Sequence, residues 1–171
     1  MPRELEHEEK LTVESFPFIA QEFCQLVEQG SFTERKHFIQ KLFTQLARLC
    51  EVANRLPWVD PTTADVDINQ NDIESKSEEC VKLSVKLRKV FGNLDRYWDV
   101  FDQTQKEGPV NGSLANDIAE IYMDLKEALS LLGNGTDLND VYWQWRLDFR
   151  SHWGRHAGSA LRFLLYISDF A

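Results

Sequence analysis

Residues 137–170 of the chain read DLNDVYWQWRLDFRSHWGRHAGSALRFLLYISDF, and this stretch decides the expected fold. At 100° per residue, one narrow stripe of a helix collects mostly apolar side chains from it. The members of that stripe are Leu138, Val141, Trp145, Phe149, His152, His156, Ser159, Phe163 and Ile167. The opposite side, called the back face below, gathers Trp143, Leu147, Gly154, Gly158, Leu161 and Leu165. Because a helix that is apolar on two sides is normally packed on two sides, we expect it to be the central helix of an all-α bundle.

Length and charge restrict the alternatives. A chain of 171 residues fits one domain, large enough to bury about 70% of the surface that its unfolded form exposes. Acidic residues outnumber basic ones 28 to 19, and the net charge is −9. This balance disfavours a sequence-independent grip on nucleic acid and binding to an anionic membrane.

Cysteine usage and hydropathy indicate a cytoplasmic protein. Cys24, Cys50 and Cys80 are far apart, odd in number and set among apolar neighbours, as expected of small core residues in a reducing compartment. The N-terminus is charged, and the richest apolar run, 160–167, is interrupted by Arg162 and too short to span a bilayer. We expect neither a signal peptide nor a transmembrane segment.

Upstream of residue 137, apolar residues recurring at three and four positions predict four more helices. Residues 1–12 are expected to be a flexible tail, followed by a bundle domain over 13–171. The expected helices span about 14–29, 31–55, 75–101 and 113–132. The stretch 56–72 has no period and reads as one long loop, and 106–112 is a connection rich in Gly, Pro and Asn. Since no segment alternates with period two over more than a few residues, no sheet is expected.

The candidate site is a cluster of histidines and carboxylates. Asp148, His152 and His156 follow one another at four-residue spacing, so they project from one flank of the last helix. Asp117 and Asp124 are seven residues apart and therefore stack on one side of the fourth helix. The sequence predicts that these two helices face each other through this cluster.

Two interpretations of the cluster stay open. A pair of histidines at i and i+4 can ligate a transition metal, and carboxylates from a facing helix complete such sites in bundles, which makes His152, His156 and Asp124 possible ligands. However, residue 153 is Trp, so the catalytic Glu of the H-E-x-x-H motif is missing. A buried histidine more often hydrogen-bonds a carboxylate in a polar patch of the core, and we favour this structural interpretation, with no cofactor.

The back face of the last helix also has two interpretations. Absent side chains at Gly154 and Gly158 allow another backbone to approach closely. We expect this face to be buried inside the monomer. If the other helices leave it open, it marks a contact with a partner or with a second copy.

Several segments resemble one bacterial family of uncharacterised proteins, known as domain of unknown function 5063. The resemblance is carried by 97–102 (YWDVFD), 117–126 (DIAEIYMDLK), 149–156 (FRSHWGRH) and 160–162 (ALR). It implies a small helical protein and assigns no activity. The second and third segments contain the carboxylates and histidines of the candidate cluster, so the resemblance pairs the same two helices.

Together these features predict a single-domain, mainly antiparallel bundle of about five helices. The expected function is a non-catalytic binding or protein-interaction module, with an unknown protein partner or self-association. The alternative is a metal-binding protein or metal-dependent enzyme that uses the His/carboxylate cluster.

Overall fold

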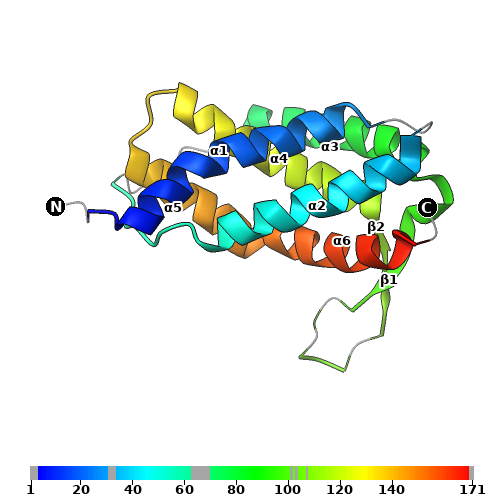
Figure 1. Ribbon diagram of the computed structural model, residues 1–171. Helices are drawn as coiled ribbons and strands as arrows, with labels where there is room; N and C mark the ends of the chain where they lie inside the picture. Colours follow the sequence, from blue (N-terminus) through cyan, green and yellow to red (C-terminus); the bar gives the residue numbers. More distant parts are fainter. Residues whose placement is uncertain are drawn as a thin grey trace.

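The computed structural model shows an elongated helical bundle with a small β-hairpin at one end (Figure 1). It describes residues 4–30, 34–62, 70–100, 102, 104–106 and 108–169, with 70–75 described by their backbone only. The helices are α1 (His7–Glu28), α2 (Arg35–Asn54), α3 (Gln70–Phe91), α4 (Leu114–Gly133), α5 (Leu138–Asp148) and α6 (Gly154–Ile167). The strands are β1 (Arg96–Asp99) and β2 (Val110–Ser113). The predicted fold class, an all-α and mainly antiparallel bundle of about five helices, is confirmed, since α5 and α6 belong to one continuous helix.

The helix at the centre of the bundle is α4, because it contacts α1, α3, α5 and α6. Its side chains Leu114, Ile118, Ile121 and Leu125 are fully buried. The expectation that the last helix is central was therefore wrong. α6 packs against α2 and α4 and leaves part of its surface open, as the 60% exposure of Leu165 shows.

The core is aromatic where α1, α4 and α5 meet. Trp145 is 1% exposed, its ring makes a tilted contact with Phe16 of α1 at a centroid distance of 4.8 Å, and its indole N–H donates to the Ala128 carbonyl at 2.9 Å. A buried indole needs such a partner for its one donor, so this bond fixes α5 against α4.

Within the described residues, no helix is both long and apolar enough to cross a membrane.

The N-terminal helix is longer than expected. α1 begins at His7, so residues 7–12, which the sequence analysis placed in a flexible tail, are helical. The Glu6 and Glu9 side chains form a reciprocal capping box at this end. Pro17 consequently lies inside the helix rather than in its first turn.

The connections before α2 and α3 fall partly outside the described residues. Residues 31–33, at the start of the predicted second helix, and 63–69 of the predicted long loop are not described. Residues 56–62 lack regular structure, as predicted. They are held to α5, because Thr62 donates its backbone N–H and its hydroxyl to Asp140.

The bounds of the third helix and the absence of a sheet were predicted incorrectly. α3 ends at Phe91, and Gly92 follows with φ of 59°, a left-handed conformation in which glycine is the usual helix stop. After a 3₁₀ turn, β1 pairs antiparallel with β2, with Tyr97 opposite Gly112 and Trp98 opposite Asn111. The strands are only four residues long, which is too short for a period-two pattern to be recognised in the sequence.

The last helix contains a π-helical turn, Phe149–Trp153, between α5 and α6, called the π-turn below. A π-turn closes i→i+5 hydrogen bonds and so takes up one residue more than an α-helical turn. Every residue after it is rotated by about 100° from its position on a uniform α-helix. The buried apolar positions after Trp145 are therefore Trp153, Ala157, Ala160, Leu164 and Ile167.

This rotation corrects the predicted core stripe. His152, His156, Ser159 and Phe163, which a uniform helix would bury, move to the flank of the bundle, and only Ile167 stays in the core. At the N-terminal end of the stripe Leu138 is 55% exposed, because it lies in the first turn of α5.

Candidate functional site

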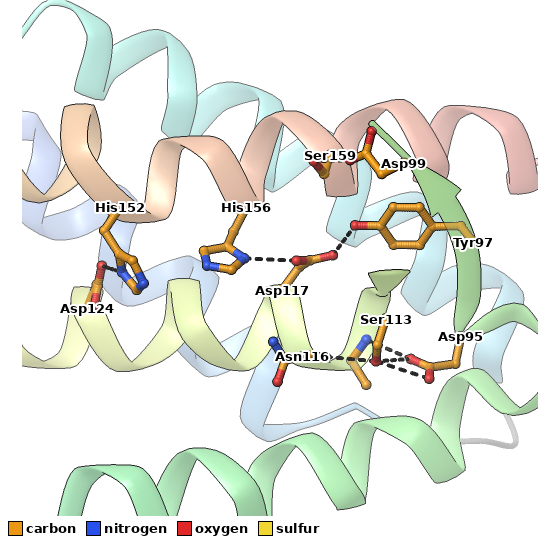
Figure 2. Close-up of polar contacts among 11 residues, drawn as sticks. Asp95, Tyr97, Asp99, Ser113, Asn116, Asp117, Asp124, His152, His156 and Ser159 are labelled. Carbon is orange, nitrogen blue, oxygen red and sulfur yellow. Dashed lines mark hydrogen bonds and ion pairs between the residues drawn. The ribbon is translucent and has the colours of Figure 1, made fainter. Parts of the chain in front are cut away.

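Two histidine–aspartate pairs join α4 to the last helix, and these four residues, Asp117, Asp124, His152 and His156, are called the histidine seam (Figure 2). His152 Nδ1 lies 2.7 Å from Asp124 Oδ2, and His156 Nδ1 lies 2.8 Å from Asp117 Oδ1. The structure thus brings together the two carboxylates and the two imidazoles that the sequence analysis selected. The pairs lie on the flank of the bundle: the His152 side chain is 48% exposed and that of His156 27%.

The π-turn creates this arrangement. His152 lies within it and His156 just after it, so the extra residue turns both rings away from the core and toward α4. Gly154, which closes the turn, is the residue that permits it, because a β-carbon there would collide with the Phe149 carbonyl oxygen. The predicted close approach at Gly154 is therefore made by the helix to itself.

The electrostatics of the two pairs differ. The hydrogen bond with Asp117 raises the pKa of His156 despite the opposing effect of burial, so this ring favours the charged form. For Asp124, burial raises the carboxyl pKa more than the hydrogen bond with His152 lowers it. The first pair is therefore favoured as an ion pair, whereas in the second pair burial opposes the charged form of Asp124.

Asp148, the fifth residue of the predicted cluster, accepts a hydrogen bond from Gln144 Nε2 at 2.7 Å rather than from a histidine. Burial raises the pKa of its carboxyl to about 7, and the nearby carboxylates of Asp124 and Glu127 add to this effect. Burial therefore favours the neutral form of Asp148 beside the seam.

Asp117 connects the seam to the hairpin. The residue is 7% exposed, and its second oxygen accepts a hydrogen bond from the Tyr97 hydroxyl of β1. The Tyr97 ring stacks on Phe163 of α6 at 4.7 Å and covers Gly112, where a β-carbon would collide with it. Burial and the bond to Asp117 both raise the pKa of Tyr97, so the phenol stays neutral and keeps its proton for Asp117.

A second contact ties the same strand to α6. Asp99 accepts from the Ser159 hydroxyl at 2.5 Å through one oxygen and pairs with the Arg162 guanidinium through the other. Burial alone would raise the pKa of Asp99, but these bonds and the Val100 N–H outweigh it and hold the pKa below the ordinary value. We call Tyr97, Asp99, Asp117, Ser159 and Arg162 the hairpin anchor.

The base of the hairpin is fixed by Asp95, which is 2% exposed. Its carboxylate accepts from the Ser113 hydroxyl at 2.9 Å and from the Ala115 N–H at 2.8 Å. Ser113 in turn caps α4 by accepting from the Asn116 N–H. These contacts join the start of β1 to the first turn of α4.

Apart from Asp117, the residues of the hairpin anchor were not predicted from the sequence. Asp99 and Ser159 are sixty residues apart in the chain, and periodicity does not report contacts at such separations. Two features of the sequence could have indicated the hairpin. One is the pair of glycines at positions 92 and 112, and the other is the two-residue spacing of Tyr97 and Asp99, which places both side chains on the same side of an extended strand.

The hollow next to the seam lies on the other side of α4. It has a volume of about 410 Å³ between α3 and α4 and is lined by Cys80, Met123, Glu120 and Asp124 among others, but by neither histidine. Among the described residues, no three His, Cys, Asp or Glu side chains converge as metal ligands would. Of the four seam residues, Asp124 borders this hollow, whereas Asp117 and the two histidines do not.

The predicted back face is divided. Leu165 and Leu147 are 60% and 40% exposed, and a β-carbon on Gly158 would meet open space. Trp143 is partly buried, and so is Leu161, which packs on the core. Leu147, Gly158 and Leu165 are therefore available for contact, whereas Leu161 supports the bundle.

These features define a class: an all-α bundle protein with a polar seam on its flank and a β-hairpin anchored beside it. The chain belongs to the family described as Domain of unknown function (DUF5063), whose model matches residues 7–169, and the resemblance noted in the sequence is confirmed. Among solved structures, it is similar to the crystal structure of protein BF1032 from Bacteroides fragilis. The TM-score is 0.71 at 20% identity, with 92% of this chain and 95% of that chain covered, which shows a shared fold. A comparison with curated proteins finds no match.

Proposed function

We propose that this protein is a non-catalytic protein-interaction module that binds its partner through the outer face of the hairpin, centred on Trp98. The observation that carries the proposal is the exposure of Trp98 between two fixed neighbours. Trp98 is 68% exposed, whereas Tyr97 and Asp99 on either side are held by the hairpin anchor.

The free-energy cost of fixing the hairpin in place supports the proposed binding role of its outer face. A two-stranded hairpin is marginally stable by itself, and this one stands out from the end of the bundle (Figure 1). Its anchor uses buried polar groups and ion pairs, which contribute little to stability once their desolvation is counted. Such an anchor restricts the position of Trp98, and a pre-positioned aromatic side chain loses little entropy when a partner binds.

The residue types on this face suit protein contact. Arg96 lies two residues before Trp98 on the same side of β1, and its guanidinium donates to Asn111 at 3.1 Å on β2. Tryptophan and arginine are the residues most often found at the energetic centre of protein interfaces. The seam then acts as a support, since Asp117 binds His156 and the strand at the same time.

The state of the cysteine thiols supports a cellular compartment for the protein. Cys24, Cys50 and Cys80 are unpaired, which fits a reducing compartment, and we assign the module to the cytoplasm.

The test compares Trp98 with Trp58, which has the same exposed fraction of 68% but stacks on Arg146 at 4.1 Å far from the hairpin. A photo-cross-linking phenylalanine analogue at position 98 should form one dominant protein adduct in cells of the source organism. The same analogue at position 58 should not. Trp98→Ala should also abolish recovery of that partner by the tagged protein, while Trp58→Ala preserves it.

The proposal fails if positions 98 and 58 give the same adducts, or if Trp98→Ala retains the partner. An unchanged unfolding midpoint for Trp98→Ala is the control, since an exposed side chain should contribute little to stability.

A second contact surface is favoured by Leu165 of the back face together with its neighbour Tyr166, which are 60% and 67% exposed. We propose that it mediates self-association, because a two-fold contact would pair this apolar strip with itself. Leu165→Glu should lower the sedimenting mass from dimer to monomer with helicity kept. A monomeric wild-type protein at high concentration rules this surface out.

A further inference from the structure

One part of the histidine seam has no role in anchoring the hairpin. The His152–Asp124 pair lies one helical turn from His156 and touches neither β1 nor β2. It nevertheless repeats the arrangement of the His156–Asp117 pair, with Nδ1 on a carboxylate of α4. A repeated arrangement outside the anchor calls for a separate explanation.

Both imidazoles keep their second nitrogen available. In each ring Nδ1 is bound to a carboxylate, and among the described residues no hydrogen bond reaches either Nε2. The two rings are close to each other, with centroids 5.0 Å apart and planes at 75°. Side-chain exposures of 48% and 27% leave the pair open to solvent.

We propose that His152 and His156 bind one divalent transition-metal ion through their Nε2 atoms, with Asp124 and Asp117 orienting the rings. Two histidines at i and i+4 on one helix form a recurrent metal-binding pair. In metal sites, a ligating histidine almost always donates its other ring N–H to a carboxylate or carbonyl, which sets the tautomer and raises the basicity of the ligand. The seam supplies that carboxylate twice.

The residues around the two histidines determine which kind of ion the site binds. Glu120 and Asp124 lie close enough to His156 to act on its charge, so the site attracts cations and repels anions. Imidazole nitrogen suits zinc, nickel and copper rather than magnesium or calcium, which prefer oxygen ligands. With two protein ligands, water completes the coordination sphere, and the ion has no structural role of the kind that four protein ligands provide. This agrees with the absence of three converging ligands among the described residues.

The binding test is calorimetric titration of Zn²⁺ into the full-length, metal-stripped protein. The decisive variants are His152→Asn and His156→Asn. Asparagine places an amide donor near the position of Nδ1 and can still bond the carboxylate of α4, but it has no counterpart of Nε2. The matched control is the double variant His7→Asn/His37→Asn, which changes the other two histidines, both exposed.

We expect one Zn²⁺ per chain for the wild type and for the control, with affinity lowered at least tenfold by either seam variant. Asp124→Asn should weaken binding about 10–100-fold, the usual effect of removing the carboxylate behind a ligand. Electron paramagnetic resonance of the Cu²⁺ form should show two nitrogen ligands in the wild type and one in His152→Asn.

The inference is wrong if the wild type binds no stoichiometric Zn²⁺, if both seam variants bind as the wild type does, or if the control loses the ion. His152→Asn decides the question even if His156→Asn unfolds, because His152 is half-exposed and separate from the hairpin anchor. The outcome is independent of the proposed interaction function, whose readout is the Trp98 adduct.

Discussion

The carbonyl oxygen of Phe149 occupies the space that a β-carbon on Gly154 would need. Gly154→Ala should therefore remove the π-turn or strain it, with a loss of about 2 kcal/mol or more in unfolding free energy. The matched control is Gly158→Ala on the same helix, where a β-carbon meets nothing within 4 Å. That change should be neutral or stabilising by up to about 1 kcal/mol, since alanine favours helix over glycine. The denaturant midpoints of the two variants measure whether each substitution lowers or raises the unfolding free energy. Equal effects of the two substitutions would contradict the role assigned to Gly154.

Tyr97→Phe should loosen the hairpin more than the bundle. The change removes the hydroxyl that donates to buried Asp117 and leaves one carboxylate oxygen without its partner, at a cost of about 1–3 kcal/mol. Amide hydrogen exchange of 96–99 and 110–113 should accelerate, with α1 and α2 unaffected. Tyr142→Phe is the control, because that ring contributes a tilted contact with Trp145 which the substitution preserves. Uniform acceleration throughout the chain would mean that the hydroxyl supports the core instead.

Asp148 should make stability depend on pH in the direction opposite to an ordinary carboxylate. Burial raises its pKa to about 7 in the folded protein, against about 3.9 in an unfolded chain. The contribution of the protonated form is fully present below about pH 4 and is lost as pH rises through 7. Asp148→Asn, which can still accept from Gln144, should match the wild type near pH 4 and exceed it by about 1–2 kcal/mol at pH 8.

Chemical denaturation at pH 4, 6 and 8 measures this difference. Asp60→Asn, the same change of net charge at an exposed position, should show no comparable gain. A variant at position 148 that is less stable than the wild type at pH 8 would show that the charged carboxylate is needed there.

The sequence predicted the helices well where apolar periodicity is long and continuous, as in α2 and α4. It also paired α4 with the last helix through Asp117, Asp124, His152 and His156. This succeeded because residues seven apart on α4 and four apart on the last helix each share one flank whatever the exact rotation. The chemistry of the seam was accessible from spacing alone.

The incorrect predictions of the core stripe and of the hairpin have one physical origin. The apolar period of a helix does not indicate where that period changes. The π-turn adds one residue to the turn that contains His152, so an α-helical projection placed the histidines in the core. The hairpin was missed for a related reason: Leu94 and Trp98 continue the apolar period of α3, although the helix has already ended before Gly92. Contacts such as Asp99 with Ser159 depend on the folded arrangement, and no local pattern encodes them.

The π-turn has the form of a one-residue insertion that the bundle has tolerated without repacking. α5 and α6 each keep a regular buried face, and the surplus residue is absorbed between Trp145 and Trp153. A chain shortened by one position here, for instance at exposed Ser151, could keep both tryptophans in place and close an ordinary α-helix. His156 belongs to α6 and keeps its place relative to Trp153, so removing one residue here would change the orientation of His152 alone. Half of the seam can therefore vary while the apolar contacts that hold the molecule together stay the same.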